Sequence, residues 1–164
     1  MSTPINYSLS SLEILLAVVN NANGSTETSS TVSFGNPQPM PAGSVRDTSV
    51  VVSAVAGGGR TGSVTIYYDR INLNTLFSLQ PLYVVATSPQ TTWDLIPILN
   101  NVFGLGLQTT DILQTNITSN TVTLQADPNS LAYEGSVAAT IVPPATSPSI
   151  SFVTDVGVTN LIGI

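Results

Sequence analysis

Hydrophobic residues recur at helical spacing in two short segments of the chain. The first segment predicts a helix over residues 12–19, with Ser8 or Ser10 as its N-cap and an Asn-rich end at Gly24. The second predicts a helix over residues 93–99, beginning near Thr91 or Thr92 and ending in residues 100–104. The apolar face of the first helix comprises Leu12, Leu15, Leu16 and Val19.

Alternating hydrophobic and polar positions with many β-branched residues predict strands in the rest of the chain. Two hairpins are expected, one joined by glycines and the other by the turn Asp127-Pro128-Asn129. A further strand or linker is expected at residues 81–87, and the proline-rich residues 35–41 predict an extended loop. The hairpin strands are predicted at residues 50–55, 63–68, 122–126 and 136–142.

The two predicted helices and the strands that follow them resemble one another at an offset of about 80 positions. We interpret this similarity as an internal duplication. The predicted fold class is α+β and β-rich, with two pseudo-repeated lobes that each combine a short helix with antiparallel strands. The first lobe is predicted at residues 1–80 and the second at residues 81–142, followed by an extended C-terminal segment at residues 143–164.

The C-terminal segment combines a proline-rich linker, residues 143–148, with an apolar, β-prone stretch, residues 149–164. This stretch is either an arm that adds a strand to a neighbouring subunit or the last strand of its own fold. In the first case its apolar side chains form an assembly interface. These residues are Ile150, Phe152, Val153, Val156, Val158, Leu161, Ile162 and Ile164.

Composition excludes several kinds of chemistry. Only 7% of residues are charged, against roughly 25% in an average domain, and histidine, cysteine and lysine are absent. These absences exclude Cys/His zinc sites, Ser-His-Asp triads, thiolate nucleophiles and Schiff bases. A net charge of −6 with three arginines argues against nucleic acid as a partner, and no apolar run is long enough to span a membrane. We expect the arginines Arg46, Arg60 and Arg70 to pair with Asp47, Asp69 or a partner's carboxylate.

The remaining candidate chemistry is a carboxylate pair for glycoside hydrolysis, drawn from Asp94, Asp111, Asp127 and Glu134. Each of these residues also has an ordinary local role, as a helix first-turn or turn residue. Calcium is the only metal that the composition suits, and the run Asp127-Pro128-Asn129 lacks the spacing of a calcium loop. We therefore predict no enzymatic activity, no metal and no cofactor.

Two motifs resemble those of a known class of protein. The first is the helix that closes in Asn-Asn-x-Asn-Gly, and the second is the strand Thr-Gly-Ser-Val-Thr-Ile-Tyr-Tyr at residues 61–68. Both have echoes in the second half, at residues 96–104 and 133–137. Together they resemble the small, repeat-built virion structural proteins of tailed bacteriophages. The resemblance implies a β-rich protein, present in many copies, that decorates or connects parts of the head or tail.

These observations predict a non-enzymatic virion subunit that assembles in the host bacterial cytoplasm. Its expected partners are other capsid or tail proteins and copies of itself, reached through a weakly charged surface of the kind found at interface cores. Two alternatives stay open: a self-assembling subunit of a tail tube or sheath, and a fibre or cell-surface module that recognises a receptor or a glycan.

Overall fold

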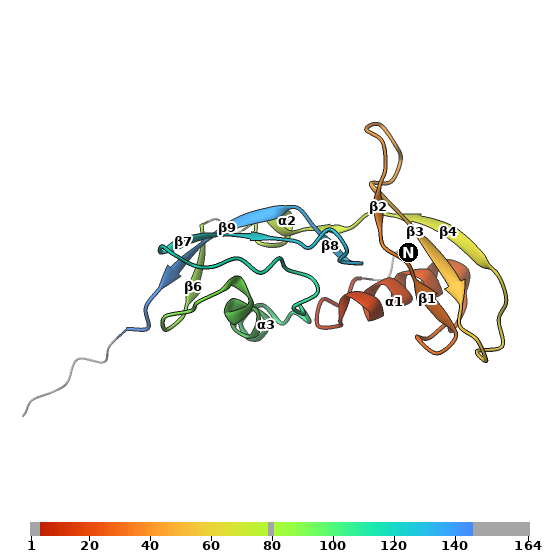
Figure 1. The fold of residues 1–164 in the computed structure, drawn as a ribbon, viewed down its shortest axis with the longest axis horizontal. Helices are drawn as coiled ribbons and strands as arrows, with labels where there is room; N and C mark the ends of the chain where they lie inside the picture. The colour runs from red at the N-terminus through yellow and green to blue at the C-terminus, as the bar shows by residue number, and fades with distance from the viewer. Residues whose placement is uncertain (1–3, 79–80, 146–164) are drawn as a thin grey trace, which may run out of the picture.

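The computed structural model describes residues 4–78 and 81–145 and has the predicted α+β, β-rich fold. Its helices and strands form two groups along an elongated molecule (Figure 1). The elements are α1 (Ser11–Asn23), β1 (Val32–Phe34), β2 (Gln38–Pro39), β3 (Thr48–Ala54), β4 (Ser63–Tyr68), β5 (Ile71–Asn72), α2 (Leu73–Leu76), β6 (Leu82–Val85), the 3₁₀ helix η1 (Thr92–Leu95), α3 (Ile96–Phe103), β7 (Thr121–Gln125), β8 (Tyr133–Glu134) and β9 (Ser136–Val142).

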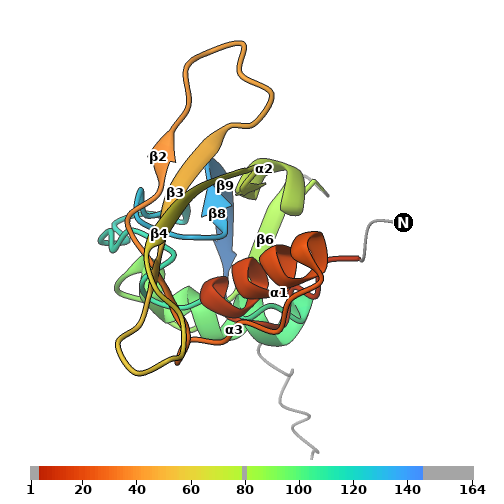
Figure 2. The same cartoon turned by 90° about the vertical axis from the view of Figure 1, so that its right-hand side faces the viewer.

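The first sheet is antiparallel and consists of β1, β2, β3 and β4. Strand β3 is central, because β1 and β2 pair with one of its edges and β4 pairs with the other. Helix α1 packs on one face of this sheet (Figure 2). Leu15 and Leu16 of α1 contribute to small hydrophobic clusters with Val50 and Val52 of β3.

Helix α1 begins and ends where its capping residues place it. Ser10 is the N-cap in a capping box with Glu13, and Gly24 ends the helix in the left-handed conformation at φ 61°. The helix extends past the predicted residues 12–19 because the asparagines before Gly24 remain helical. Its side chains divide between the two groups, since Ile14 joins the second core while Leu15 and Leu16 join the first.

The second sheet consists of β6, β9 and β7 in that order. Strand β9 pairs antiparallel with β7 and parallel with β6, and α3 packs beside β6. This sheet has the larger hydrophobic core. Leu73 and Phe77 pack in that core although they precede residue 81, and β5 pairs with β8.

The two halves form matching hydrogen bonds after their helices. The Asn20 side chain donates to the Glu27 carbonyl (2.8 Å) and accepts from the Glu27 N–H (2.7 Å). Asn100 makes the same two contacts with Leu107, at 2.8 and 3.0 Å. Gly104, like Gly24, ends its helix with a positive φ. The two helices therefore end in the same local geometry.

The prediction of an extended loop at residues 35–41 was wrong in part. Gln38 and Pro39 form β2 and pair with Ser49 and Thr48 of β3. Proline fits here because β2 lies at an edge, where the missing N–H interrupts no ladder between two strands. The short elements β1, β5, α2 and β8 were not predicted, because runs of two to four residues show no periodicity.

Two buried tyrosines differ in their hydrogen bonding, and burial raises the pKa of each to about 12. The Tyr68 hydroxyl donates to the Leu131 carbonyl at 2.8 Å. The Tyr133 hydroxyl has no hydrogen-bond partner among the described residues. We expect Tyr68→Phe to lower the free energy of unfolding by about 1 kcal/mol, because it removes a buried hydrogen bond.

Tyr133→Phe serves as the matched control, and we expect it to leave the free energy of unfolding unchanged or slightly higher. It removes a buried hydroxyl that has no partner in the described part of the chain, so no hydrogen bond seen there is lost. Urea denaturation of both variants measures the difference. Equal losses in the two variants would contradict this account.

Candidate functional site

The four carboxylates considered for glycoside hydrolysis serve separate local roles. Asp94 accepts hydrogen bonds from the backbone N–H groups of Gln90 and Thr91, both at 2.8 Å, and so caps η1. Asp127 accepts from the Asn129 N–H within its turn. Glu134 lies 3.7 Å from Arg70 in an ion pair.

Asp111 is the one candidate that is buried, with 1% of its surface exposed. Its Oδ1 accepts hydrogen bonds from the hydroxyls of Ser11 and Ser130, the latter at 2.7 Å, and its Oδ2 accepts from the Gln108 N–H at 2.9 Å. Ser11 belongs to α1 and Ser130 to the turn between β7 and β8, so one carboxylate joins both halves of the chain. With donors on both oxygens and almost no exposed surface, Asp111 has a structural role.

The three arginines all form ion pairs within the described chain. Arg46 pairs with Asp69, as expected, whereas Arg60 pairs with Glu27, which was not among the expected carboxylates. Arg70 reaches Glu134 and also donates to the carbonyls of Pro128, Ser130 and Tyr133. The expectation that Asp47 pairs with an arginine side chain was wrong. Its carboxylate accepts instead from the backbone N–H of Arg70.

Within residues 4–78 and 81–145, no three acidic side chains lie close enough together to hold a metal ion. The same part of the chain contains no helix of sufficient length and apolar character to cross a membrane.

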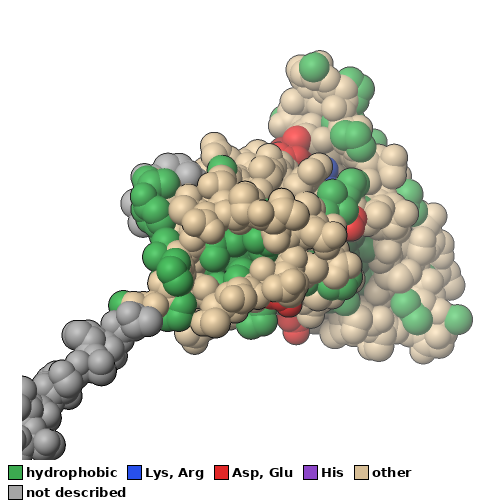
Figure 3. Space-filling model, turned by 60° about the vertical axis from the view of Figure 1, so that its left-hand side comes forward, with side chains coloured by type: hydrophobic (Ala, Val, Ile, Leu, Met, Phe, Trp, Pro, Cys, Tyr) green, Lys and Arg blue, Asp and Glu red, His purple; other side chains and the backbone are tan. Residues whose placement is uncertain are grey.

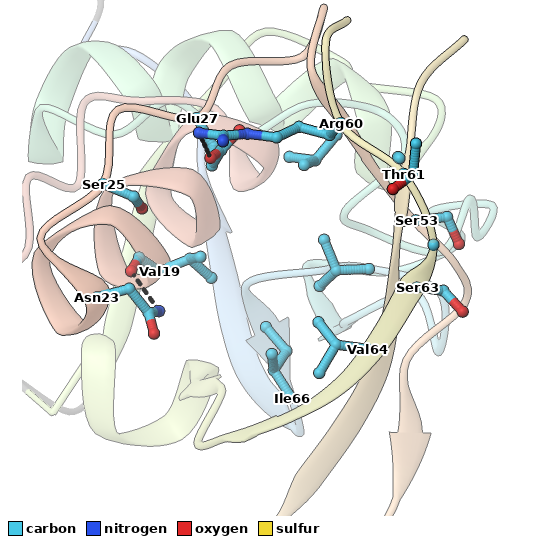
Figure 4. Close-up of a pocket in the computed structure, with 14 residues that line it drawn as sticks. Val19, Asn23, Ser25, Glu27, Ser53, Arg60, Thr61, Ser63, Val64 and Ile66 are labelled. Atoms are coloured by element: carbon cyan, nitrogen blue, oxygen red, sulfur yellow. Dashed lines mark hydrogen bonds and ion pairs between the residues drawn. The ribbon is translucent and has the colours of Figure 1, made fainter.

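An open apolar groove lies between α1 and β4. It encloses about 400 Å³. Figure 4 shows Val19 of α1 on one side and Val64 and Ile66 of β4 on the other. At its rim, the Arg60 guanidinium and Glu27 carboxylate lie 2.6 Å apart. Hydrogen bonding to Thr31, and then to Arg60, holds the pKa of Glu27 below its usual range.

The groove borders a free sheet edge. Among the described residues, β4 pairs with β3 alone, and its other edge carries no strand. Val64 of β4 is 60% exposed, although it faces Val52 across the ladder and Val52 is buried. An exposed apolar residue at an open strand edge is a ready site for an added strand.

The predicted assembly residues 150–164 lie outside the described residues. The groove itself was not predicted from the sequence. The alternation of Val64 and Ile66 signals an apolar strand face, but it does not show whether another element covers that face.

The arrangement defines a small α+β protein whose described ionisable groups serve turns, caps and ion pairs, and which has an apolar groove beside an open strand edge. Residues 4–164 match the model of a family of unknown function, DUF7941, and the chain belongs to this family. No curated protein and no solved structure matches the chain.

The structural role of Asp111 predicts the cost of removing it. Asp111→Ala leaves two buried hydroxyls and one part-buried N–H without their acceptor, so we expect the free energy of unfolding to fall by at least about 2 kcal/mol. Asp111→Asn keeps one acceptor oxygen and should cost less. Urea denaturation measures both, with Asp127→Ala as a control at a partly exposed turn. A loss no larger than that of the control would contradict this role.

The Asp94 carboxylate makes the stability of the fold depend on pH. Hydrogen bonds from the Thr91 and Gln90 backbone lower the pKa of Asp94 in the folded protein below its unfolded value. The ionised carboxylate therefore stabilises the fold above pH 4 or so, and this contribution is lost as pH falls through the folded pKa. We expect Asp94→Ala to lower the melting temperature at pH 6 and to have a smaller effect at pH 3. An undiminished difference at pH 3 would exclude this cause.

Proposed function

We propose that this protein is a non-enzymatic structural subunit that is present in many copies in a bacteriophage particle, as a decoration or accessory protein of the head or tail. The assignment to a phage follows from the motif resemblance alone. The structural role of the subunit is supported by the surface of the folded chain.

The observation that carries the proposal is the set of exposed apolar side chains on the strands of both sheets. Aromatic and β-branched side chains are exposed on strands of both sheets. Monomeric soluble proteins rarely leave such strands uncovered next to a free edge. These exposed residues are Val51, Val64, Tyr67, Tyr83 and Val85.

The surface has few charges to oppose association. All three arginines are already paired within the described chain. Figure 3 shows one face of the molecule, where hydrophobic side chains lie among backbone and uncharged side chains and few acidic groups are visible. A surface with few charged residues resembles the core of a protein–protein interface.

We expect quantitative mass spectrometry of purified particles of the phage that encodes this chain to find it in many copies, in a fixed ratio to the major head or tail protein. A structural subunit occupies every equivalent site of a symmetric assembly, so its number follows the symmetry. A host enzyme packaged by accident gives low and variable numbers and serves as the comparison. Absence of the chain from the particles would overturn the proposed function.

A further inference from the structure

The two sheets differ at one edge. Ala54 donates its backbone N–H to the Gly62 carbonyl at 3.0 Å, and Ala126 makes the same bond to Gly135 at 2.9 Å. The β3–β4 hairpin of the first sheet therefore corresponds to the β7–β9 pair of the second. In the second sheet, β6 lies along the outer edge of β9, whereas the outer edge of β4 is free in the described chain.

The groove lies where the first sheet has no counterpart of β6. Val64 pairs with Val52 in the first sheet, as Val137 pairs with Leu124 in the second. Val64 is 60% exposed, but Val137 is only 3% exposed. The second sheet buries the Leu82 and Val84 side chains of β6 at the place where the first sheet has its open groove.

The described residues before α1, 4–10, do not fill this place. In the second half, β6 precedes α3, so the corresponding residues of the first half are those before α1. Ile5 and Tyr7 instead line a hollow with Asn72 and Leu76, and the Tyr7 carbonyl accepts a hydrogen bond from Gly106 at 2.8 Å. These contacts hold residues 5–7 against the second half of the chain, away from β4.

The groove and the free edge of β4 point to a strand supplied by a second copy of this chain, and we propose that the strand is residues 156–159 of that copy. The chain itself shows this kind of donation, because the segment after β4 supplies β6 to the next sheet. The segment after β9 has the corresponding position in the second half of the chain. Strand β4 ends at Tyr68 and β9 ends at Val142. The number of positions from Tyr68 to Leu82 equals the number from Val142 to Val156.

The side-chain pattern of the proposed strand fits the groove. Leu82 and Val84 alternate as the buried residues of β6, and Val156 and Val158 have the same spacing. In the parallel register of β6 on β9, Leu82 pairs with Ala139 and Tyr83 pairs with Thr140. The same register on β4 places Val156 beside Ile66 over the groove and the intervening Gly157 beside Tyr67 on the outer face.

The positions of the tail and of β4 favour donation of the strand to another copy of the chain. The described chain ends at Ala145 beyond β9, at the opposite end of the elongated molecule from β4 (Figure 1). A contact between the tail of one copy and the first sheet of the next is heterologous, so repetition gives a ring or an open filament. The inference rests on the proposed function and assigns the surface by which copies join.

Cross-linking between two sets of copies tests the pairing directly, because the chain has no cysteine of its own. One set carries Tyr67→Cys and the other, with a mass tag, carries Gly157→Cys. After mixing and oxidation we expect a disulfide-linked heterodimer, at about ten times the yield of a control pair that combines Val51→Cys with Gly157→Cys. Val51 is an exposed valine of the same sheet on β3, away from the free edge.

Equal yields from the test and control pairs, or no heterodimer, would overturn the proposal. A single chain that carries both Tyr67→Cys and Gly157→Cys shows whether the tail reaches its own β4. If that chain forms an internal disulfide while the mixture forms no heterodimer, the occupant is the same copy and donation between copies is wrong.

Solution mass provides a second test on the full chain without cross-links. We expect the weight-average mass to rise with concentration for the native chain and for Val51→Glu, and to stay at 17.0 kDa for Val64→Glu. Val64 is exposed, so a charge there blocks strand addition without disturbing the fold, and circular dichroism checks that the fold is kept. A native chain that is monomeric at every concentration, or a Val64→Glu chain that associates, would overturn the strand donation.

The two proposals fail separately. A chain that is monomeric in solution but present in many copies in the particle overturns strand donation and leaves the structural role in place. A chain that associates through β4 but is absent from particles overturns the phage role alone.

Discussion

The buried carboxylate of Asp111 holds the two halves of this protein in a fixed relation. Its oxygens accept hydrogen bonds from α1, from the turn after β7 and from its own loop. A buried carboxylate without these donors would be costly, so the three segments must meet with their donors aimed at one point. That constraint sets the position of α1, which then packs Ile14 into the second core and Leu15 and Leu16 against the first sheet.

Because α1 is shared, the two sheets are covered unequally. The second sheet has a helix, an added strand and the larger core, and its inward side chains are buried. The first sheet has only part of one helix on its inner face, and its small clusters end at a groove beside β4. The groove beside β4 is therefore a consequence of how the hydrophobic segments of the chain are divided between the two sheets. An assembly that supplies one more strand would complete the first sheet as β6 completes the second.

Much of the local structure could be predicted from the sequence. Ser10 and Gly24 mark the ends of α1, and alternation identifies β3, β4, β7 and β9, because caps and strand periodicity act over a few neighbouring residues. The contacts of the candidate site were harder to predict from the sequence. Asp111 reads in sequence as an ordinary turn residue, and its partners Ser11 and Ser130 are far away along the chain, so local patterns carry no sign of their contact.

The sequence by itself determined the α+β class, the scarcity of charge, the absence of histidine, cysteine and lysine, and the position of the main helices and hairpins. These properties depend on composition and on spacing between near neighbours. Only the tertiary structure decided which sheet edge is covered, since β6 could have paired with either sheet and its alternation is the same in both cases. The exposure of Val64 and the burial of Val137 follow from that choice, because a strand face is buried only when another segment of chain packs against it.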